Sequence, residues 1–213
     1  MILRSIVIPF ALTAASAQLV AAQTPQQSIA QSCVPAAISS LKVTLRAQKT
    51  EQWCWAASAE MLMEYFGKSV QQCDQANARL GRTDCCKAKT PKACIAGGWP
   101  ELPRYGFDFK RTSGTALAWT DVQAQLAPRD PNNPCSFTPF AFSWHWVGGS
   151  GHMMVAVGYK TTSDGKRYVL VNNPWPPSKG KTEYVLYDAY VDLSGDHTHW
   201  DDFYDVKPLG QRP

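Results

Sequence analysis

The spacing of hydrophobic residues changes along the chain, from a period near four to a period of two. In the first half, Ala57, Met61 and Tyr65 repeat every four residues, as on one face of a helix. Gly67 follows at a position where glycine commonly ends a helix. The pattern therefore predicts an amphipathic helix that begins near Cys54 and ends before Gly67.

Two further helices are predicted from capping-box patterns, in which a Ser or Thr precedes a Gln by three residues. The first pattern opens at Ser69, and its helix is expected to end at Gly81. The second opens at Thr120 and gives a short helix to about Leu126. Between them, residues 83–109 hold three cysteines, a Gly-Gly pair and three prolines, so we expect a loop held by disulfides.

The period of two begins after residues 128–134, which contain three prolines and two asparagines. Large apolar side chains alternate with smaller or polar ones from Phe140 to Trp146, which is typical of a strand. Further strand-like segments are residues 153–159, 167–172 and 183–191, with a turn at Asp164-Gly165 between two of them. The prediction is an α+β protein, with a helical lobe at about 41–128 and an antiparallel β lobe at about 135–213.

The first 22 residues have the features of a signal peptide. Arg4 supplies a positive start, residues 6–12 are mostly apolar, and small residues permit cleavage after Ala17 or Ala22. The alternative is a transmembrane helix, but polar residues from Thr13 onward cut the apolar run short of the ~20 residues that a span needs. We therefore expect an exported protein, secreted or periplasmic, with a signal peptide at 1–22, a mobile arm at 23–40 and one domain at 41–213.

Composition excludes some classes of function. The chain has 213 residues, of which 45% are hydrophobic and 18% charged, and this suits a globular domain with a core. The formal net charge is only +4, and the sequence has no basic run of the kind that binds nucleic acid. We expect no nucleic-acid partner.

The chain has seven cysteines, and an odd number in an oxidising compartment leaves one without a partner. Cys54 is the candidate for the free thiol; the candidates for three disulfides are Cys33, Cys73, Cys85, Cys86, Cys94 and Cys135. The adjacent pair Cys85 and Cys86 should take different partners, with Cys73 and Cys94 nearest in sequence. The rival interpretation is a zinc site or redox centre built from these four, although the C-x-x-C spacing typical of zinc sites is missing.

Cys54 lies between Trp53 and Trp55, in the first turn of the first predicted helix. A thiol there is close to free N–H groups and to the positive end of the helix dipole, and both favour the reactive thiolate. The alternative is a small buried cysteine that packs beside aromatic rings. A reactive cysteine also needs a base within reach, and His152 is the best candidate, since it starts a strand directly after the flexible loop 148–151.

The other histidines fit other environments. His145 lies mid-strand between two tryptophans, where we expect a packed or half-exposed ring. His197 and His199 have acidic neighbours and could bind a metal, but their polar surroundings favour a solvated loop. Asn173 ends a strand and could accept a hydrogen bond from His152, shielded by Trp175; alternatively, Asn173-Pro174 only opens a turn.

Five segments in order resemble the papain-like cysteine proteases, most closely a compact bacterial branch similar to staphopain and to the avirulence-type effector proteases of plant pathogens. The resemblance spans residues 48–175, and its segments are Gln48, Cys54-Trp55-Ala56-Ala57-Ser58-Ala59, Asp84-Cys85-Cys86 with Cys94-Ile95-Ala96-Gly97-Gly98-Trp99-Pro100, the run from His152 to Tyr159, and Asn173-Pro174-Trp175. The chain departs from the larger members at Glu51, where they carry a second cysteine, and in shorter spacings from Cys54 to His152 and Asn173.

This resemblance implies a two-lobe fold, in which a helical lobe packs against an antiparallel sheet or barrel-like lobe and the active site lies in the cleft between them. It also implies a catalytic Cys54, His152 and Asn173, an oxyanion-hole Gln48, and supporting roles for Trp55 and Trp175. The expected enzyme is a monomeric endopeptidase that cleaves proteins or peptides through a thioacyl intermediate, with no cofactor, no metal and no membrane partner once the signal peptide is removed. The same residues could serve a transamidase or deamidase, or the fold could be a catalytically silent binding module.

Overall fold

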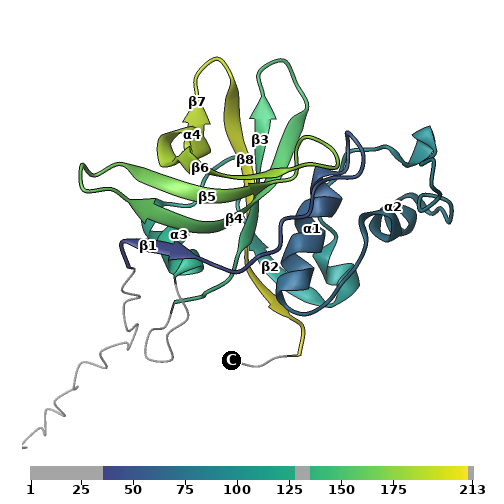
Figure 1. Ribbon diagram of the computed structural model, residues 1–213, viewed down its shortest axis with the longest axis horizontal. Helices are drawn as coiled ribbons and strands as arrows, with labels where there is room; N and C mark the ends of the chain where they lie inside the picture. Colours follow the sequence, from purple (N-terminus) through teal and green to yellow (C-terminus); the bar gives the residue numbers. More distant parts are fainter. Residues whose placement is uncertain (1–35, 128–134, 211–213) are drawn as a thin grey trace, which may run out of the picture. The chain divides into compact units, whose positions relative to one another are not determined.

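The computed structural model describes residues 36–127 and 135–210 (Figure 1). The predicted signal peptide, Cys33 and the proline-rich crossing at 128–134 therefore lie outside the described residues. Within the described residues, no helix combines the length and the apolar character that crossing a membrane requires.

One antiparallel sheet is the centre of the described structure (Figure 1). Its strands are β1 (Ile38–Ser40), β2 (Phe107–Arg111), β3 (Phe140–Trp146), β4 (Gly151–Thr161), β5 (Arg167–Asn173), β6 (Lys181–Leu186), β7 (Asp192–Leu193) and β8 (His197–Pro208). The main order is β2-β8-β3-β4-β5-β6, while β1 pairs with β4 and β7 with β8. The final strand β8 thus lies inside the sheet, between β2 and β3.

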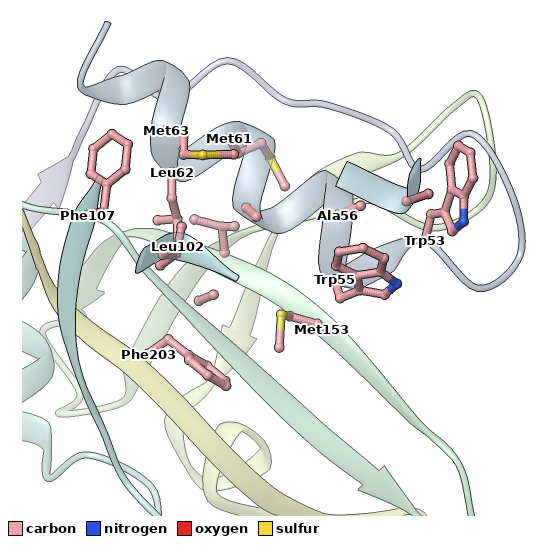
Figure 2. Packing of buried hydrophobic residues seen from close by; sticks show 14 of the residues in the cluster. Trp53, Trp55, Ala56, Met61, Leu62, Met63, Leu102, Phe107, Met153 and Phe203 are labelled. Atoms are coloured by element: carbon pink, nitrogen blue, oxygen red, sulfur yellow. The ribbon is translucent and has the colours of Figure 1, made fainter. Parts of the chain in front are cut away.

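The helices cover both faces of this sheet. Helix α1 (Cys54–Tyr65) packs on one face, where Met153, Val155 and Val157 of β4 join its hydrophobic cluster (Figure 2). Helices α3 (Trp119–Leu126) and α4 (Tyr187–Val191) pack on the other, with Met154 and Ala156. Successive side chains of a strand point to opposite faces, so β4 contributes to both clusters.

The predicted first helix is α1, and Gly67 follows it with a positive φ of 82°. The predicted starts of the next two helices were wrong. Helix α2 (Gln72–Leu80) begins three residues after Ser69, and α3 begins at Trp119, so that Thr120 lies inside it. Neither helix has a side-chain hydrogen bond at its N-cap. In the first pattern, the expected capping glutamine Gln72 is buried and instead donates to Glu60 (2.8 Å) and to the carbonyl of Ala47 (3.0 Å).

The structure corrects two expected segments. Residues 38–40 were assigned to a mobile arm, yet they form β1, in register with residues 158–160 of β4. Residues 187–191 were expected to continue a strand but form α4, in which Tyr187 and Tyr190 stack at 5.7 Å between ring centroids. Residues three apart share a helical face, which explains why these two rings meet.

The division between a helical and a β half is less sharp than the sequence suggests. Strand β2 comes from the helical half but pairs with β8. Helix α3 also comes from that half, yet it packs on the face of the sheet opposite α1. The short 3-10 helices η1 (Lys92–Cys94) and η2 (Leu102–Tyr105) complete the first half.

One disulfide, Cys73–Cys86, links α2 to the loop that follows it, and a second, Cys85–Cys94, joins that loop to η1. The adjacent cysteines thus take different partners, and none of the four sulfurs is available as a thiolate ligand for zinc. Cys135 is also disulfide-bonded. Among the described residues, Cys54 is the free cysteine.

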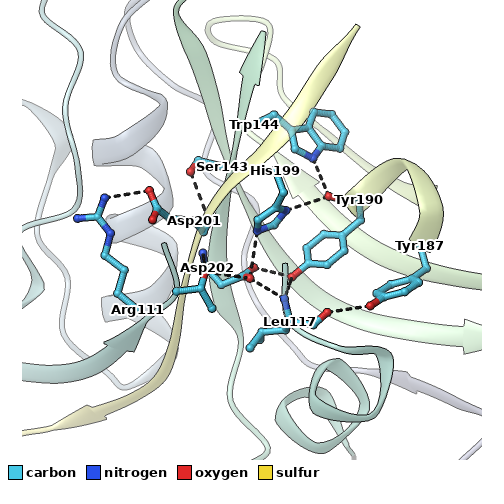
Figure 3. Close-up of polar contacts among 10 residues, drawn as sticks. Arg111, Leu117, Ser143, Trp144, Tyr187, Tyr190, His199, Asp201 and Asp202 are labelled. Carbon is cyan, nitrogen blue, oxygen red and sulfur yellow. Dashed lines mark hydrogen bonds and ion pairs between the residues drawn. The ribbon is translucent and has the colours of Figure 1, made fainter. Parts of the chain in front are cut away.

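The prediction of a solvated loop around His197 and His199 was wrong. Both belong to β8 and are only 2% and 7% exposed. His199 Nε2 lies 3.0 Å from Asp202 Oδ2, and His199 Nδ1 contacts the carbonyl of Tyr190 at 2.9 Å (Figure 3). The same carboxylate also accepts hydrogen bonds from the Tyr190 hydroxyl and the Leu117 N–H. These polar residues are therefore part of a buried hydrogen-bonded network.

Candidate active site

A cavity of about 1000 Å³ brings together residues from both halves of the chain. Its lining comes from the start of α1, the loop at residues 97–99, the ends of β3, β4 and β5, and β8. Four of the predicted site residues line it: Cys54, His152, Asn173 and Trp175. Gln48, Trp55 and His145 are not among its lining residues.

Cys54 is the first residue of α1 and is partly exposed. Burial of the sulfur raises the pKa of its thiol, while backbone hydrogen bonds from Met153 and Trp55 act in the opposite direction. The bond from Met153 places the sulfur beside the start of β4, and Cys54 and His152 line the same cavity. A charged partner is therefore needed to make the Cys54 thiolate at neutral pH.

His152 is the second residue of β4 and pairs with Trp144 of β3. Its Nε2 lies 2.8 Å from Oδ1 of Asn173. Because an amide oxygen only accepts, Nε2 carries the proton and donates, which leaves Nδ1 of the neutral ring free to accept a proton. The Trp146 ring lies nearly parallel to the imidazole, with centroids 6.4 Å apart.

Burial lowers the pKa of His152, whereas the hydrogen bond to Asn173 and the charge of Glu183 raise it. Desolvation is the largest of these effects. Burial therefore acts against charge on Cys54 alone and on His152 alone. An ion pair of the two has no net charge, so mutual attraction can offset both costs.

Both the oxygen and the nitrogen of the Asn173 side-chain amide form hydrogen bonds. Oδ1 accepts from His152 and also from the backbone N–H of Trp175 at 3.0 Å, while Nδ2 donates to Oε1 of Glu183 at 3.1 Å. The bond to Trp175 is that of an Asx turn, so Asn173 opens a turn and binds the histidine at the same time. The Trp175 side chain is 45% exposed at the cavity.

Gln48 is fully buried and is placed differently from the predicted oxyanion donor. Its Nε2 donates to the carbonyls of Thr50 (2.8 Å) and Glu51 (3.0 Å), just ahead of α1. Its backbone N–H donates to Pro174, which ties this segment to the turn after Asn173. The structure thus gives Gln48 a role in holding two site segments, and its part in an oxyanion hole stays a prediction.

The two tryptophans beside Cys54 bind the disulfide loop. The indole N–H of Trp53 donates to the carbonyl of Cys94 at 2.8 Å, and that of Trp55 to the carbonyl of Ala96 at 3.0 Å. The next residues, Gly97 and Gly98, line the cavity. These bonds fix the loop against the start of α1. They give Trp53 a structural role, which the sequence motif does not indicate.

Several residues of the site could not be found from local sequence. The cavity is also lined by Arg79, Trp99, Trp144, Trp146 and Trp200. Trp200 packs against Gly151, where an added Cβ would lie 2.8 Å from the ring. The pairing of β3 with β4 and β8 brings Trp144, Trp146 and Trp200 to the cavity, whereas Arg79 comes from α2 and Trp99 from the loop after η1. A motif search along one segment does not contain that information.

The chain was compared with known proteins. The model of the Peptidase_C39 like family matches residues 40–197. The Amb a 11 cysteine protease of ragweed pollen, in its proform, superimposes with a TM-score of 0.52 and 15% identity, over 86% of this chain and 64% of that chain. The peptidase domain of Streptococcus ComA gives a TM-score of 0.45 and 14% identity, over 78% and 99% of the two chains. None of the curated proteins matches.

The family match covers most of the chain and includes Gln48, Cys54, His152 and Asn173. The superposition on the ragweed protease confirms the papain-like fold predicted from the resemblance. The narrower prediction of a staphopain-like branch stays a prediction. The chain thus belongs to the Peptidase_C39 like family and is a cysteine peptidase with a papain-like fold.

Proposed function

We propose that this peptidase is an exported endopeptidase in which Cys54 is the nucleophile, His152 the general base and acid, and Asn173 the residue that orients the histidine. One observation carries the proposal: the hydrogen bond of 2.8 Å between His152 and Asn173, in the same cavity as the free thiol of Cys54. It leaves Nδ1 of His152 available to the thiol, as a nucleophile–base pair requires.

In the first step, the Cys54 thiol passes its proton to Nδ1 of His152, and the thiolate attacks the carbonyl carbon of the scissile peptide bond. The imidazolium then protonates the leaving amine, which departs as the thioacyl-enzyme forms. His152 next takes a proton from water as the water attacks the thioester. The acid product leaves, and Cys54 returns to its thiol form.

The negative charge that develops on the carbonyl oxygen needs hydrogen-bond donors. The backbone N–H of Cys54 is a good candidate, because the first N–H groups of a helix have no partner within the helix. The predicted second donor is the amide of Gln48, which would turn from the carbonyls of Thr50 and Glu51 toward substrate. A donor of this kind stabilises the transition state by about 3 kcal/mol.

Export is supported by the two disulfides among the described residues, since such bonds persist in oxidising compartments. Cys73, Cys85, Cys86 and Cys94 are all engaged in them, which leaves Cys54 for chemistry. The side chains that surround Cys54 provide a complete set of groups for acyl transfer, and no step of the proposed reaction calls for a cofactor.

The test is cleavage of an unfolded protein by the exported enzyme and by Cys54→Ala, with products identified by mass spectrometry. New peptide termini that appear only with the native enzyme support an endopeptidase. Amide groups exchanged for added amines, or converted to acids without chain cleavage, would instead indicate a transamidase or deamidase. Full cleavage by Cys54→Ala would overturn the proposal.

A second pair of variants tests the choice of base. His152→Ala should abolish cleavage, whereas His145→Ala should leave most of it, because His145 is exposed and does not line the cavity. Loss of activity in the His145 variant alone would show that the base is assigned to the wrong histidine.

A further inference from the structure

Glu183 contacts the far side of Asn173, away from His152. It belongs to β6, where it pairs with Val171 of β5, so it lies on the same face of the sheet as Asn173 two residues further along. Its Oε1 accepts from Nδ2 of Asn173 at 3.1 Å, and its Oε2 lies 2.8 Å from Nζ of Lys181. Glu183 does not line the cavity, so it would not contact substrate there.

The carboxylate determines which way the Asn173 amide points. An ionised carboxylate only accepts hydrogen bonds, so it must face the NH2 group of the amide rather than the oxygen. Rotation of the amide by half a turn would place Oδ1 against Glu183, and NH2 against the N–H groups of His152 and Trp175. Glu183 therefore holds Oδ1 toward His152, which keeps the proton on Nε2 and leaves Nδ1 to the thiol.

We propose that Glu183 is a positioning residue of the catalytic site, which acts through Asn173 to hold His152 in its working tautomer and to stabilise the imidazolium. This inference rests on the proposed function, since it assigns His152 and Asn173 their catalytic roles. It extends the Cys54-His152-Asn173 group by a fourth residue on a neighbouring strand, at a position that no motif indicates.

The charge of Glu183 acts in the same direction as its hydrogen bond. Its carboxylate raises the pKa of His152, against the effect of burial. Other charged or titratable groups near the imidazole are Cys54 on α1 and, at the cavity wall, Glu51 and Arg79. Lys181 partly neutralises Glu183, and the carboxylate side chain is 34% exposed, so solvent screens part of its effect.

The first test compares Glu183→Gln with Lys181→Met across a pH series of kcat/KM. The alkaline limb follows loss of the proton from His152, and removal of a negative charge disfavours the imidazolium. The limb of Glu183→Gln should therefore move to lower pH. Lys181→Met is the matched control, because it leaves the bond between Glu183 and Asn173 intact and removes the charge that partly neutralises Glu183, so its limb should not move to lower pH.

Glu183→Ala removes both the charge and the hydrogen bond to Asn173. The value of kcat should therefore fall about tenfold with KM nearly unchanged, as is typical when a residue that orients a functional side chain is lost. Glu183→Asp retains the charge, so the alkaline limb of its kcat/KM profile should lie at the native pH. A purely structural role would lower the thermal stability of all these variants and leave the pH profile where it is. The inference would be overturned if the alkaline limb of kcat/KM in Glu183→Gln and the kcat of Glu183→Ala both equal those of the native enzyme.

A second measurement does not depend on peptidase activity. The titration of His152 is followed by NMR in the Cys54→Ala background, with and without Glu183→Gln, and its signal is assigned by its loss in His152→Ala. We expect the midpoint of His152 to fall when Glu183 becomes Gln, and an unchanged midpoint would contradict the link. If the chain cleaves no substrate but the midpoint falls, the proposed function fails while the contact between Glu183 and the histidine stands.

Discussion

The indole N–H of Trp53 donates to the carbonyl of Cys94 at 2.8 Å, across 41 residues of sequence. Cys94 is bonded in turn to Cys85, so the residue before the nucleophile is attached to a disulfide loop. Trp55 makes the equivalent bond to Ala96. The start of α1 and the loop that carries Gly97 and Gly98 thus hold each other in place on one side of the cavity.

Trp53→Phe should lower the free energy of unfolding by about 1–3 kcal/mol beyond the effect of the smaller ring, because the Cys94 carbonyl loses a buried donor. Urea unfolding of the oxidised protein measures this change. Trp119→Phe, on the other face of the sheet, is the size-matched control. Trp119 packs its ring against Tyr159 and Tyr187, and these ring contacts involve no hydrogen bond to a carbonyl. Equal losses in the two variants would show that ring packing, and not the hydrogen bond, is what Trp53 contributes.

Unreduced protein should react with iodoacetamide selectively at Cys54 near pH ~5.5, well below the pKa of about 8.5 of an ordinary thiol. In His152→Ala the labelling should slow sharply, because burial raises the pKa of Cys54 and no imidazolium remains to oppose that effect. The rate is measured by mass spectrometry of the peptide that contains Cys54. His145→Ala is the control and should label like the native protein.

An equally slow reaction of the native protein and of a free thiol peptide at this pH would exclude a resting ion pair of Cys54 and His152. Since burial disfavours each charge alone, such a result would mean that proton transfer occurs only once substrate is bound.

Gln48→Ala should lower kcat by about 10²–10³-fold if its amide is an oxyanion donor, with a smaller effect on KM. If Gln48 only holds the carbonyls of Thr50 and Glu51, the loss should appear in the unfolding free energy instead. Steady-state kinetics and urea unfolding of the same variant separate the two roles. Gln52→Ala is the control, because Gln52 is an exposed glutamine at the same cavity and the variant shows the effect of losing an amide there.

Asp202→Asn should lower the free energy of unfolding by about 1–3 kcal/mol, the usual effect of leaving a buried hydrogen-bond donor without its acceptor. Asp202 is fully buried, accepts from Tyr190 and Leu117, and lies 3.0 Å from His199 (Figure 3). An asparagine must place its NH2 group against one of these donors. Asp188→Asn, whose side chain is 91% exposed, should change stability little; similar losses in both would contradict a special role for the buried network.

The sequence alone determined the elements whose signals are local. The periodicity of Ala57, Met61 and Tyr65 predicted α1, and alternation predicted β3 and most of β4 and β5. The order of the motifs from Gln48 to Trp175 indicated a papain-like cysteine protease, and the comparisons confirmed the papain-like fold and the cysteine peptidase. Such signals survive because a helix face or a strand face is specified by residues a few positions apart.

Only the tertiary structure decided which polar residues are buried and what they contact. His197 and His199 have the composition of a solvated loop, yet they are buried, because β3 and β7 pair with this part of β8 and the two rings stack on Trp144 and Phe142. Likewise, Glu183 reaches Asn173 only through the register of β5 with β6, and Trp53 reaches Cys94 only across the packed loop. Strand register and loop packing join residues that are distant in sequence, so no local pattern of hydrophobic and polar positions can specify these contacts.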